Sequence, residues 1–233
     1  MRIGGLQRFS LVDYPGRVSA VVFTQGCNFR CPYCHNPQLV YPMLFDVPMA
    51  EDDVLQYLQK RRGMIQGVVI SGGEALMQDD LAAFLRQVKD MGYPVKLDTN
   101  GSFPDHLEML LAKGLIDYVA MDYKAPVRIY AEAAGVPVSA PDIIKSLRLC
   151  IESGIRHEAR TTVFDLLSAD ALEEAASEIS SYGVQRYYLQ MYRKHPKHCG
   201  DLSPRGLDNE RLLIQLNQSF SEWGIRNVIT PAI

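Results

Sequence analysis

The stretch Gly26-Cys27-Asn28-Phe29-Arg30-Cys31-Pro32-Tyr33-Cys34-His35-Asn36 holds three of the chain's five cysteines within eight residues. Thiolates this closely spaced can bind zinc, form a redox disulfide or ligate an iron-sulfur cluster, and the number and spacing of the ligands distinguish these sites. A structural zinc site would need one more protein ligand than the three local cysteines provide. Three thiolates on a 4Fe-4S cluster leave one iron open to a substrate. We therefore interpret residues 26–36 as an iron-sulfur cluster loop.

A zinc knuckle completed by His35 is the alternative for this loop. His35 directly follows Cys34, so strain would oppose ligation of one ion by both side chains. The other two cysteines, Cys150 and Cys199, each stand alone without a partner at ligand spacing. We expect Cys199 to be a free thiol rather than part of a second metal site.

Length and composition favour a single soluble unit. The chain has 233 residues, of which 47% are hydrophobic, and this suffices for one sizeable core. We expect one domain over residues 1–233, with a core at about 16–191 and a C-terminal extension at 192–233. The formal net charge of -3 and the pI near 6.0 provide no basic field, so we do not expect nucleic acid as a partner.

Targeting and membrane signals are not evident in the sequence. Residues 1–5 lack the charged and apolar regions of a signal peptide, and no apolar run approaches the about 18 residues that span a bilayer. We therefore expect a cytoplasmic protein without a membrane partner. Because the cytoplasm keeps thiols reduced, the clustered cysteines point to metal binding or catalysis rather than to structural disulfides.

Short β-branched runs alternate with amphipathic stretches along the chain, which is typical of βα units with a parallel sheet. We predict strands at 18–24, 68–70, 95–99, 116–121, 157–163 and 187–191. Helices are predicted at 48–62, 79–91, 104–113, 126–134, 142–153 and 169–182. A last helix at 207–223 and an edge strand at 227–229 complete the prediction. Six such units predict an α/β fold, a partial (β/α)6 barrel that is open on one side.

Polar residues follow four of these strands at their C-terminal ends. The cysteine loop follows the first strand, Gly72-Gly73-Glu74 the second, Asp98-Thr99-Asn100 the third, and Asp122 and Lys124 the fourth. Each group has a plain structural explanation as a tight turn or an exposed ion pair. Because the carboxyl ends of parallel strands meet at one edge, however, the four groups together predict a single site there.

The spacing Cys27-x3-Cys31-x2-Cys34, with Tyr33 before the last cysteine, resembles the radical S-adenosylmethionine (SAM) superfamily. Within it, Cys34-His35-Asn36 and the upstream Asp13-Tyr14-Pro15-Gly16 resemble the enzymes that activate glycyl-radical enzymes. The activating proteins of anaerobic ribonucleoside-triphosphate reductases are the nearest group, with pyruvate formate-lyase activating enzymes as near relatives. The likeness runs from about residue 9 to about residue 190 and implies a partial barrel of the radical SAM type.

This resemblance implies one 4Fe-4S cluster on Cys27, Cys31 and Cys34, with SAM bound at the open iron. The residues implied in cofactor binding are Tyr33, His35, Gly72, Gly73, Glu74, Asp98, Asn100, Asp122, Lys124, Arg160 and His195. Gly72-Gly73-Glu74 would bind the amino group of SAM, and Glu74 could accept hydrogen bonds from that ammonium.

Further roles follow from the same resemblance. Lys124 would pair with the SAM carboxylate, while Asp98 and Asp122 would bind SAM through a monovalent cation, or Asp122 through the ribose. His195 would lie near the adenine. Arg160 is open between two interpretations, a merely exposed strand position and an inward guanidinium that binds a carboxylate.

The segment with Asp13, Tyr14 and Pro15 resembles the one that related activases present to their substrate loop, although Tyr14 stands where they have glycine. The implied reaction is reductive cleavage of SAM to methionine and a 5'-deoxyadenosyl radical, which takes a hydrogen atom from a glycine of the partner. Flavodoxin or ferredoxin would supply the electron. Alternatives are a radical SAM enzyme acting on a small molecule, similar to 7-carboxy-7-deazaguanine synthase, and a zinc-stabilised binding module.

Overall fold

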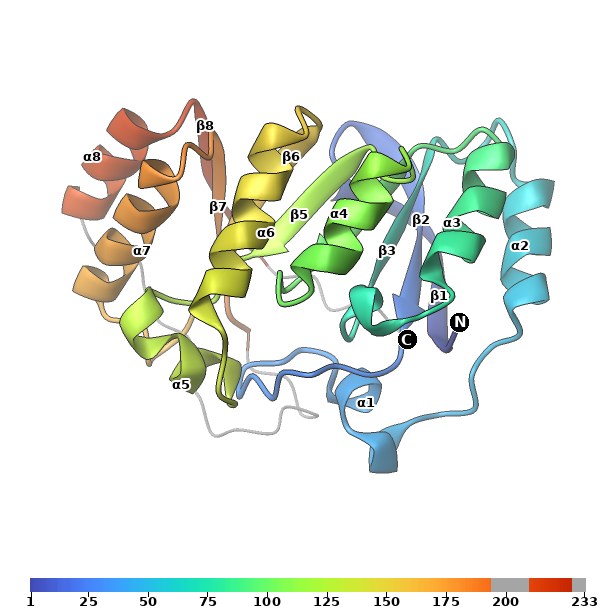
Figure 1. Cartoon of the computed structure of the whole chain (residues 1–233), viewed down its shortest axis with the longest axis horizontal. Helices are drawn as coiled ribbons and strands as arrows, with labels where there is room; N and C mark the ends of the chain where they lie inside the picture. The colour runs from blue at the N-terminus through green and yellow to red at the C-terminus, as the bar shows by residue number, and fades with distance from the viewer. Residues whose placement is uncertain (194–209, 228–233) are drawn as a thin grey trace.

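The computed structural model describes residues 1–193 and 210–227, and one sheet runs through all of this part of the chain (Figure 1). Eight strands lie in the order β1-β2-β3-β4-β5-β6-β7-β8; β1 is antiparallel to β2, and every later neighbouring pair is parallel. The bounds are Ile3–Tyr14, Arg17–Thr24, Gly67–Gly72, Val95–Thr99, Tyr118–Asp122, Arg156–Val163, Arg186–Met191 and Glu222–Asn227. The sheet forms a half-barrel, which confirms the predicted α/β partial barrel.

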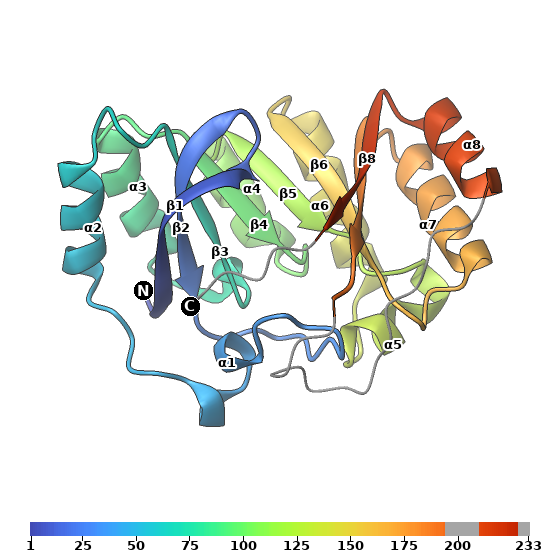
Figure 2. The same ribbon diagram turned by 180° about the vertical axis from the view of Figure 1, so that it is seen from behind.

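Helices cover one face of this sheet, and no helix within residues 1–193 and 210–227 covers the other face (Figure 2). The longer helices are α2 Glu51–Lys60, α3 Leu81–Asp90, α4 Pro104–Ala112, α6 Ala140–Glu152, α7 Ala169–Ser181 and α8 Glu210–Ser219. The short ones are α1 Pro37–Val40 and α5 Tyr130–Ala134, with 3-10 turns η1 Pro42–Leu44, η2 Ala75–Met77 and η3 Val127–Ile129. Among the described residues, no helix is both long and apolar enough to cross a membrane.

The helix boundaries follow from local chemistry. Helix α2 begins with three acidic residues and ends at Lys60, so its terminal charges complement the helix dipole. Helix α3 buries Leu81, Phe84, Leu85 and Val88, which recur at helical spacing and pack against the sheet. These positions belong to the main apolar core on the convex side, whereas the concave side combines polar residues with a smaller apolar cluster that includes Val21, Val69 and Tyr118.

The predictions missed one strand and misplaced another. Strand β1 was not predicted because its residues mix polar and apolar types, it is partly exposed, and its pairing with β2 is broken by register shifts. At the C-terminal end the predicted helix 207–223 ends at Ser219, and Glu222–Asn227 is strand β8. The predicted edge strand at 227–229 lies largely outside the described residues.

Two glycines bring the end of β3 against the loop that follows β2. Gly72 has a φ of 118°, and a Cβ there would lie 2.4 Å from the backbone nitrogen of Thr24. A Cβ on Gly73 would lie 2.0 Å from the carbonyl oxygen of Gly26. Neither site can accept a side chain without moving the backbone. The glycine pair therefore allows the cysteine loop and the third strand to meet.

Candidate active site

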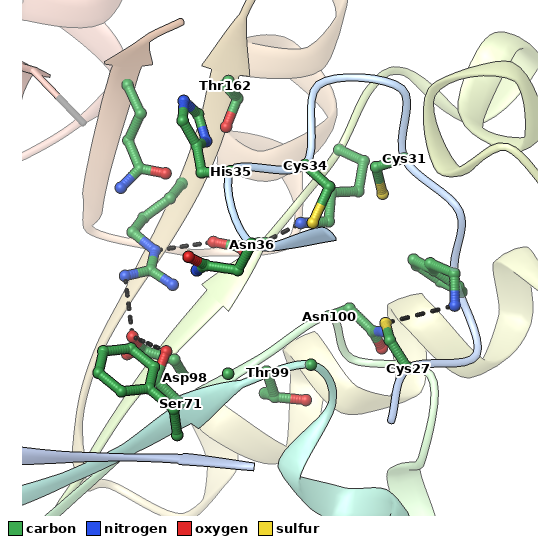
Figure 3. A pocket seen from close by; sticks show the side chains of 18 of the residues that line it. Cys27, Cys31, Cys34, His35, Asn36, Ser71, Asp98, Thr99, Asn100 and Thr162 are labelled. Atoms are coloured by element: carbon green, nitrogen blue, oxygen red, sulfur yellow. Dashed lines mark hydrogen bonds and ion pairs between the residues drawn. The ribbon is translucent and has the colours of Figure 1, made fainter. Parts of the chain in front are cut away.

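A cavity of about 600 Å³ occupies the concave side of the sheet, between the cysteine loop and the β1–β2 hairpin. Its walls come from β2 to β8 and from both loops (Figure 3). They include the residues Val12, Asp13, Pro15, Cys27, Cys31, Tyr33, Cys34, His35, Gly72, Gly73, Lys96, Asp98, Asn100, Asp122, Lys124, Glu158, Arg160, Thr162, Gln190 and Arg226. The structure thus brings together, in one cavity, nearly all the residues singled out from the sequence.

The cysteine loop is fixed to its surroundings by backbone hydrogen bonds. Gly26 N donates to Leu39 O at 2.7 Å, Glu74 N to Gly26 O at 2.8 Å, and Arg30 N to Ala134 O at 2.8 Å. The Arg30 guanidinium also donates to the carbonyl of Cys27 at 2.6 Å. Contacts with the turn after β3, with α1 and with α5 therefore hold the backbone of the cysteine loop in place.

All three thiols of the loop line the cavity, and none is in a disulfide. Around Cys27 Sγ lie two N–H donors, the backbone of Phe29 at 3.4 Å and the side-chain amide of Asn100 at 3.9 Å (Figure 3). Burial, with the charge of Glu74 as a smaller cause, raises the pKa of Cys27 to about 12, and burial also raises the pKa of Cys31. Metal cations would offset this cost of ionisation. The donor set therefore fits a sulfur-ligated cluster.

Glu74 lies at the predicted strand end, but its side chain faces the protein interior. Its side chain is completely buried and lines no part of the cavity. One carboxylate oxygen accepts from Leu76 N at 3.0 Å and Thr99 Oγ1 at 2.8 Å, and the other from Asn100 N at 2.7 Å. The carboxylate thus holds the end of β4, including Asn100, and its contact with a bound ammonium stays a prediction.

Asp98 and Asp122 lie in an ion-pair network on the inner face of β4, β5 and β6. Arg160 Nε donates to Asp122 at 2.8 Å, and its guanidinium lies 3.6 Å from Asp98. Lys124 donates to the other oxygen of Asp122 at 2.9 Å. Although burial opposes ionisation, Arg160 and Lys124 hold the pKa of Asp122 at about 2, and the pKa of Asp98 is also lowered.

This ion-pair network distinguishes the two interpretations of Arg160, an exposed strand position and an inward guanidinium. Its side chain is 11% exposed and points into the cavity, so the interpretation as a merely exposed strand position is wrong. Burial lowers the pKa of Lys124, but Asp122 outweighs it, and the net effect is a raised pKa. Both cations therefore remain charged beside the cavity and are suited to a carboxylate.

Two aromatic side chains of the loop also border the cavity. The Tyr33 ring is buried, lies 4.2 Å from the ring of Phe164, and has the Lys124 ammonium 5.9 Å from its centroid. The His35 ring lies 5.7 Å from that of Tyr192. Both rings therefore provide flat apolar walls beside the cysteines. His195, the remaining predicted contact, lies outside the described residues.

At the other end of the cavity, the β1–β2 hairpin contributes Val12, Asp13 and Pro15. The Asp13 carboxylate is held by the Ser10 hydroxyl, which also accepts from the backbone nitrogen of Asp13 at 3.2 Å. Tyr14 points elsewhere: it is 4% exposed and its ring packs edge-on against Tyr118. Of the three residues predicted to meet a partner, Asp13 and Pro15 therefore line the cavity, and Tyr14 lies in an apolar cluster.

Three charged residues that line the cavity were not predicted from the sequence to belong to the site: Lys96, Glu158 and Arg226. Glu158 is buried, accepts from Tyr118 Oη at 2.7 Å and pairs with Arg226 at 2.8 Å. Alternation along β4 and β6 would have placed Lys96 on the face of Asp98, and Glu158 on that of Arg160. No such signal existed for Arg226, because β8 was not predicted.

The sequence of this chain is similar to a known protein family and to individual members of it. Residues 21–179 match the model of the radical SAM superfamily. A Methanocaldococcus jannaschii protein named as a candidate glycyl-radical enzyme activating enzyme is 31% identical over 228 residues, which cover 89% of this chain and 93% of the relative. The pyruvate formate-lyase 2-activating enzyme of Escherichia coli is 26% identical over 235 residues, which cover 84% of this chain and 80% of that enzyme.

A solved structure shows the same fold at low sequence identity. SuiB of Streptococcus suis, bound to S-adenosylmethionine, superposes with a TM-score of 0.71 at 15% identity. The match covers 90% of this chain and 50% of SuiB, so this chain spans half the length of that protein. The likeness concerns the fold of the half-barrel.

Proposed function

Since this chain belongs to the radical SAM superfamily and, within it, to the glycyl-radical enzyme activating enzymes, we propose that its partner is an anaerobic ribonucleoside-triphosphate reductase. It would cleave SAM reductively and generate a glycyl radical on that reductase. The observation that carries this proposal is the convergence of the three thiols, the glycine turn and the Arg160–Lys124 cations on one cavity.

Membership of the family implies a 4Fe-4S cluster and SAM, and we propose Cys27, Cys31 and Cys34 as the cluster ligands. When bound, the cluster supplies the electron that cleaves a carbon–sulfur bond of SAM, so that methionine and a 5'-deoxyadenosyl radical form. The radical then takes one hydrogen atom from the glycine Cα, which gives 5'-deoxyadenosine and the glycyl radical. The electron donor that we propose is flavodoxin or ferredoxin, and such a reduced system fits the cytoplasm.

The chain's own residues would hold SAM at the edge of the sheet. The half-buried backbone of Gly72 and Gly73 lines the cavity and would face its amino group, because the side chain of Glu74 lines no part of the cavity and accepts three hydrogen bonds from the protein. Lys124 and Arg160 would bind its carboxylate, since each carries protons that can reach into the cavity. Tyr33, His35 and Asn100 would border the cofactor from the loop and from the end of β4.

The partner would reach the cavity from the side that helices leave uncovered (Figure 2). Asp13 and Pro15 lie on this route, at the end opposite the cysteines. A carboxylate fixed by Ser10 can accept hydrogen bonds from the backbone of an entering polypeptide. An entering polypeptide could therefore be bound at the β1–β2 hairpin, which supports a protein substrate.

The test is anaerobic incubation of cluster-reconstituted protein with SAM and reductant, with and without the reductase. Methionine and 5'-deoxyadenosine are expected in both cases, and a glycyl doublet in the electron paramagnetic resonance spectrum is expected only with the reductase. SAM cleavage without a glycyl signal would reject the activase proposal in favour of a small-molecule substrate. Protein that carries zinc without iron or sulfide would reject the cluster as well.

A further inference from the structure

Lys96 is a buried lysine in the middle of a short strand. Its side chain is 2% exposed, and it lies on the inner face of β4, two residues before Asp98. Its ammonium contacts Asp98 Oδ1 and lies 6.0 Å from the ring centroid of Tyr118. A buried ammonium is costly unless an opposite charge compensates it, so Lys96 and Asp98 form one electrostatic unit.

Every carboxylate oxygen of Asp98 and Asp122 already has a partner from the protein. Asp98 Oδ1 contacts Lys96, and Oδ2 accepts from Ser71 Oγ at 3.0 Å and lies 3.6 Å from the Arg160 guanidinium. Asp122 Oδ1 accepts from Arg160 at 2.8 Å, and Oδ2 from Lys124 at 2.9 Å. Each carboxylate oxygen is therefore in contact with a donor of the chain itself.

The charge balance of this ion-pair network also argues against a bound sodium or potassium ion. The network contains two carboxylates, those of Asp98 and Asp122, and three cationic side chains, those of Lys96, Lys124 and Arg160. These five side chains together carry one excess positive charge. The nearby Glu158 and Arg226 neutralise each other at 2.8 Å. A sodium or potassium ion would meet like charges in a buried setting, where repulsion is strong. A carboxylate, in contrast, would be attracted by the excess positive charge of the network.

We infer that Lys96 is a positioning residue that supplies, from within the chain, the positive charge that the resemblance assigned to a monovalent cation, so SAM binding needs neither sodium nor potassium. The inference rests on the proposed function, because it concerns SAM in the same cavity. Lys96 acts through Asp98 and does not itself touch SAM.

The wild-type test compares the dissociation constant of SAM from cluster-reconstituted protein in tetramethylammonium, sodium and potassium chloride at equal ionic strength. Anaerobic calorimetry would measure it. We expect less than an about fivefold difference among the three salts, since linked binding of an ion normally changes affinity by more. A constant lower by about fivefold or more in sodium or potassium would overturn the inference.

A variant tests the role of Lys96 itself. Lys96→Met keeps the length of the side chain and removes the charge, which leaves Asp98 undercompensated. We expect SAM binding to Lys96→Met to weaken in tetramethylammonium and to recover by about fivefold or more in potassium. The cluster-free variant should also gain thermal stability from potassium, which the cluster-free wild type should not. Salt-independent SAM binding by Lys96→Met would show that Lys96 does not replace the ion.

Lys89→Met is the matched control, because Lys89 forms its ion pair with Asp117 away from the cavity, at 2.7 Å. It should keep the salt independence of the wild type. Should Lys96→Met fail to fold, the wild-type comparison still decides the inference. Absence of SAM binding in all three salts would overturn the proposed function and this inference with it, whereas SAM binding that requires potassium would overturn this inference alone.

Discussion

Residues around the cavity differ in whether their polar atoms are already used inside the protein. The Glu74 carboxylate accepts three hydrogen bonds from the protein, whereas Lys124 and Arg160 have protons in reach of the cavity. Sequence motifs place a residue on a strand end but do not say which neighbours use its atoms. This is why the position of Glu74 at the strand end was predicted, whereas its hydrogen bonds to the protein were not.

Removal of one proposed cluster ligand tests the sulfur set. Cys31→Ala should abolish both iron and sulfide incorporation and SAM cleavage, because two thiolates would remain for the cluster. Cys150→Ala is the matched control, since Cys150 is a buried cysteine of the core that does not line the cavity. Iron and sulfide analysis after anaerobic reconstitution measures the effect. Equal loss of iron from both variants would contradict the ligand assignment.

Glu74 predicts a pH dependence of stability. Burial raises its pKa from 4.5 to about 7, despite the hydrogen bonds from Asn100, Leu76 and Thr99. A carboxyl with a higher pKa in the folded state favours folding when it is protonated, so this contribution is complete below about pH 4.5 and is lost as the pH rises to about 7. The loss should amount to about 3 kcal/mol.

Denaturant unfolding of the cluster-free protein between about pH 5 and about pH 8 measures this contribution against Glu74→Gln, which cannot titrate. The free energy of unfolding of the wild type should fall relative to that of the variant as the pH rises. Parallel profiles for the two proteins would mean that the Glu74 carboxyl has the same pKa in the folded and unfolded chain.

The helices and strands differ in how strongly the sequence pattern predicts them. Strand β3 is a buried run with 68–70 fully apolar, and α3 has a single apolar face, so both were predicted close to their bounds. Strand β1 has a mixed pattern with bulges, and β8 includes Gly224 and several polar residues. Their places depend on neighbouring strands rather than on local preference, and this could not be predicted from the sequence.

The β1–β2 hairpin is the element that we propose as the contact of the partner. Asp13→Asn keeps the shape of the side chain and removes its charge, so glycyl-radical formation on the reductase should fall by about tenfold, the effect of losing one charged hydrogen bond. SAM cleavage without the reductase should be unchanged, because Asp13 lies at the far end from the cysteines.

Asp52→Asn on the exposed start of α2 is the control for this prediction, and it should leave both reactions unchanged. Spin quantitation of the glycyl signal and chromatography of 5'-deoxyadenosine give the two rates. An Asp13→Asn variant that loses both rates in parallel would place Asp13 in SAM binding instead of partner contact.

The whole molecule combines one continuous sheet with one cavity on its uncovered face. The same sheet runs from β1 to β8 through the described residues, and this supports our proposal of one domain over the chain. Repeated βα units made the half-barrel predictable, since right-handed crossovers bring all strand ends to one edge. The charge pairing inside the cavity was not predictable, because it depends on residues from strands far apart in sequence, such as Asp98 and Arg160.

Hydrogen transfer from a labelled partner tests the central claim of the proposed activity most directly. The reductase would be prepared with glycine in which both Cα hydrogens are replaced by deuterium. It would be mixed anaerobically with SAM, reductant and the reconstituted protein. We predict that 5'-deoxyadenosine gains one deuterium and that the glycyl doublet collapses, since the splitting arises from the remaining Cα hydrogen. Unlabelled 5'-deoxyadenosine with no glycyl signal would contradict hydrogen abstraction from a glycine of the reductase.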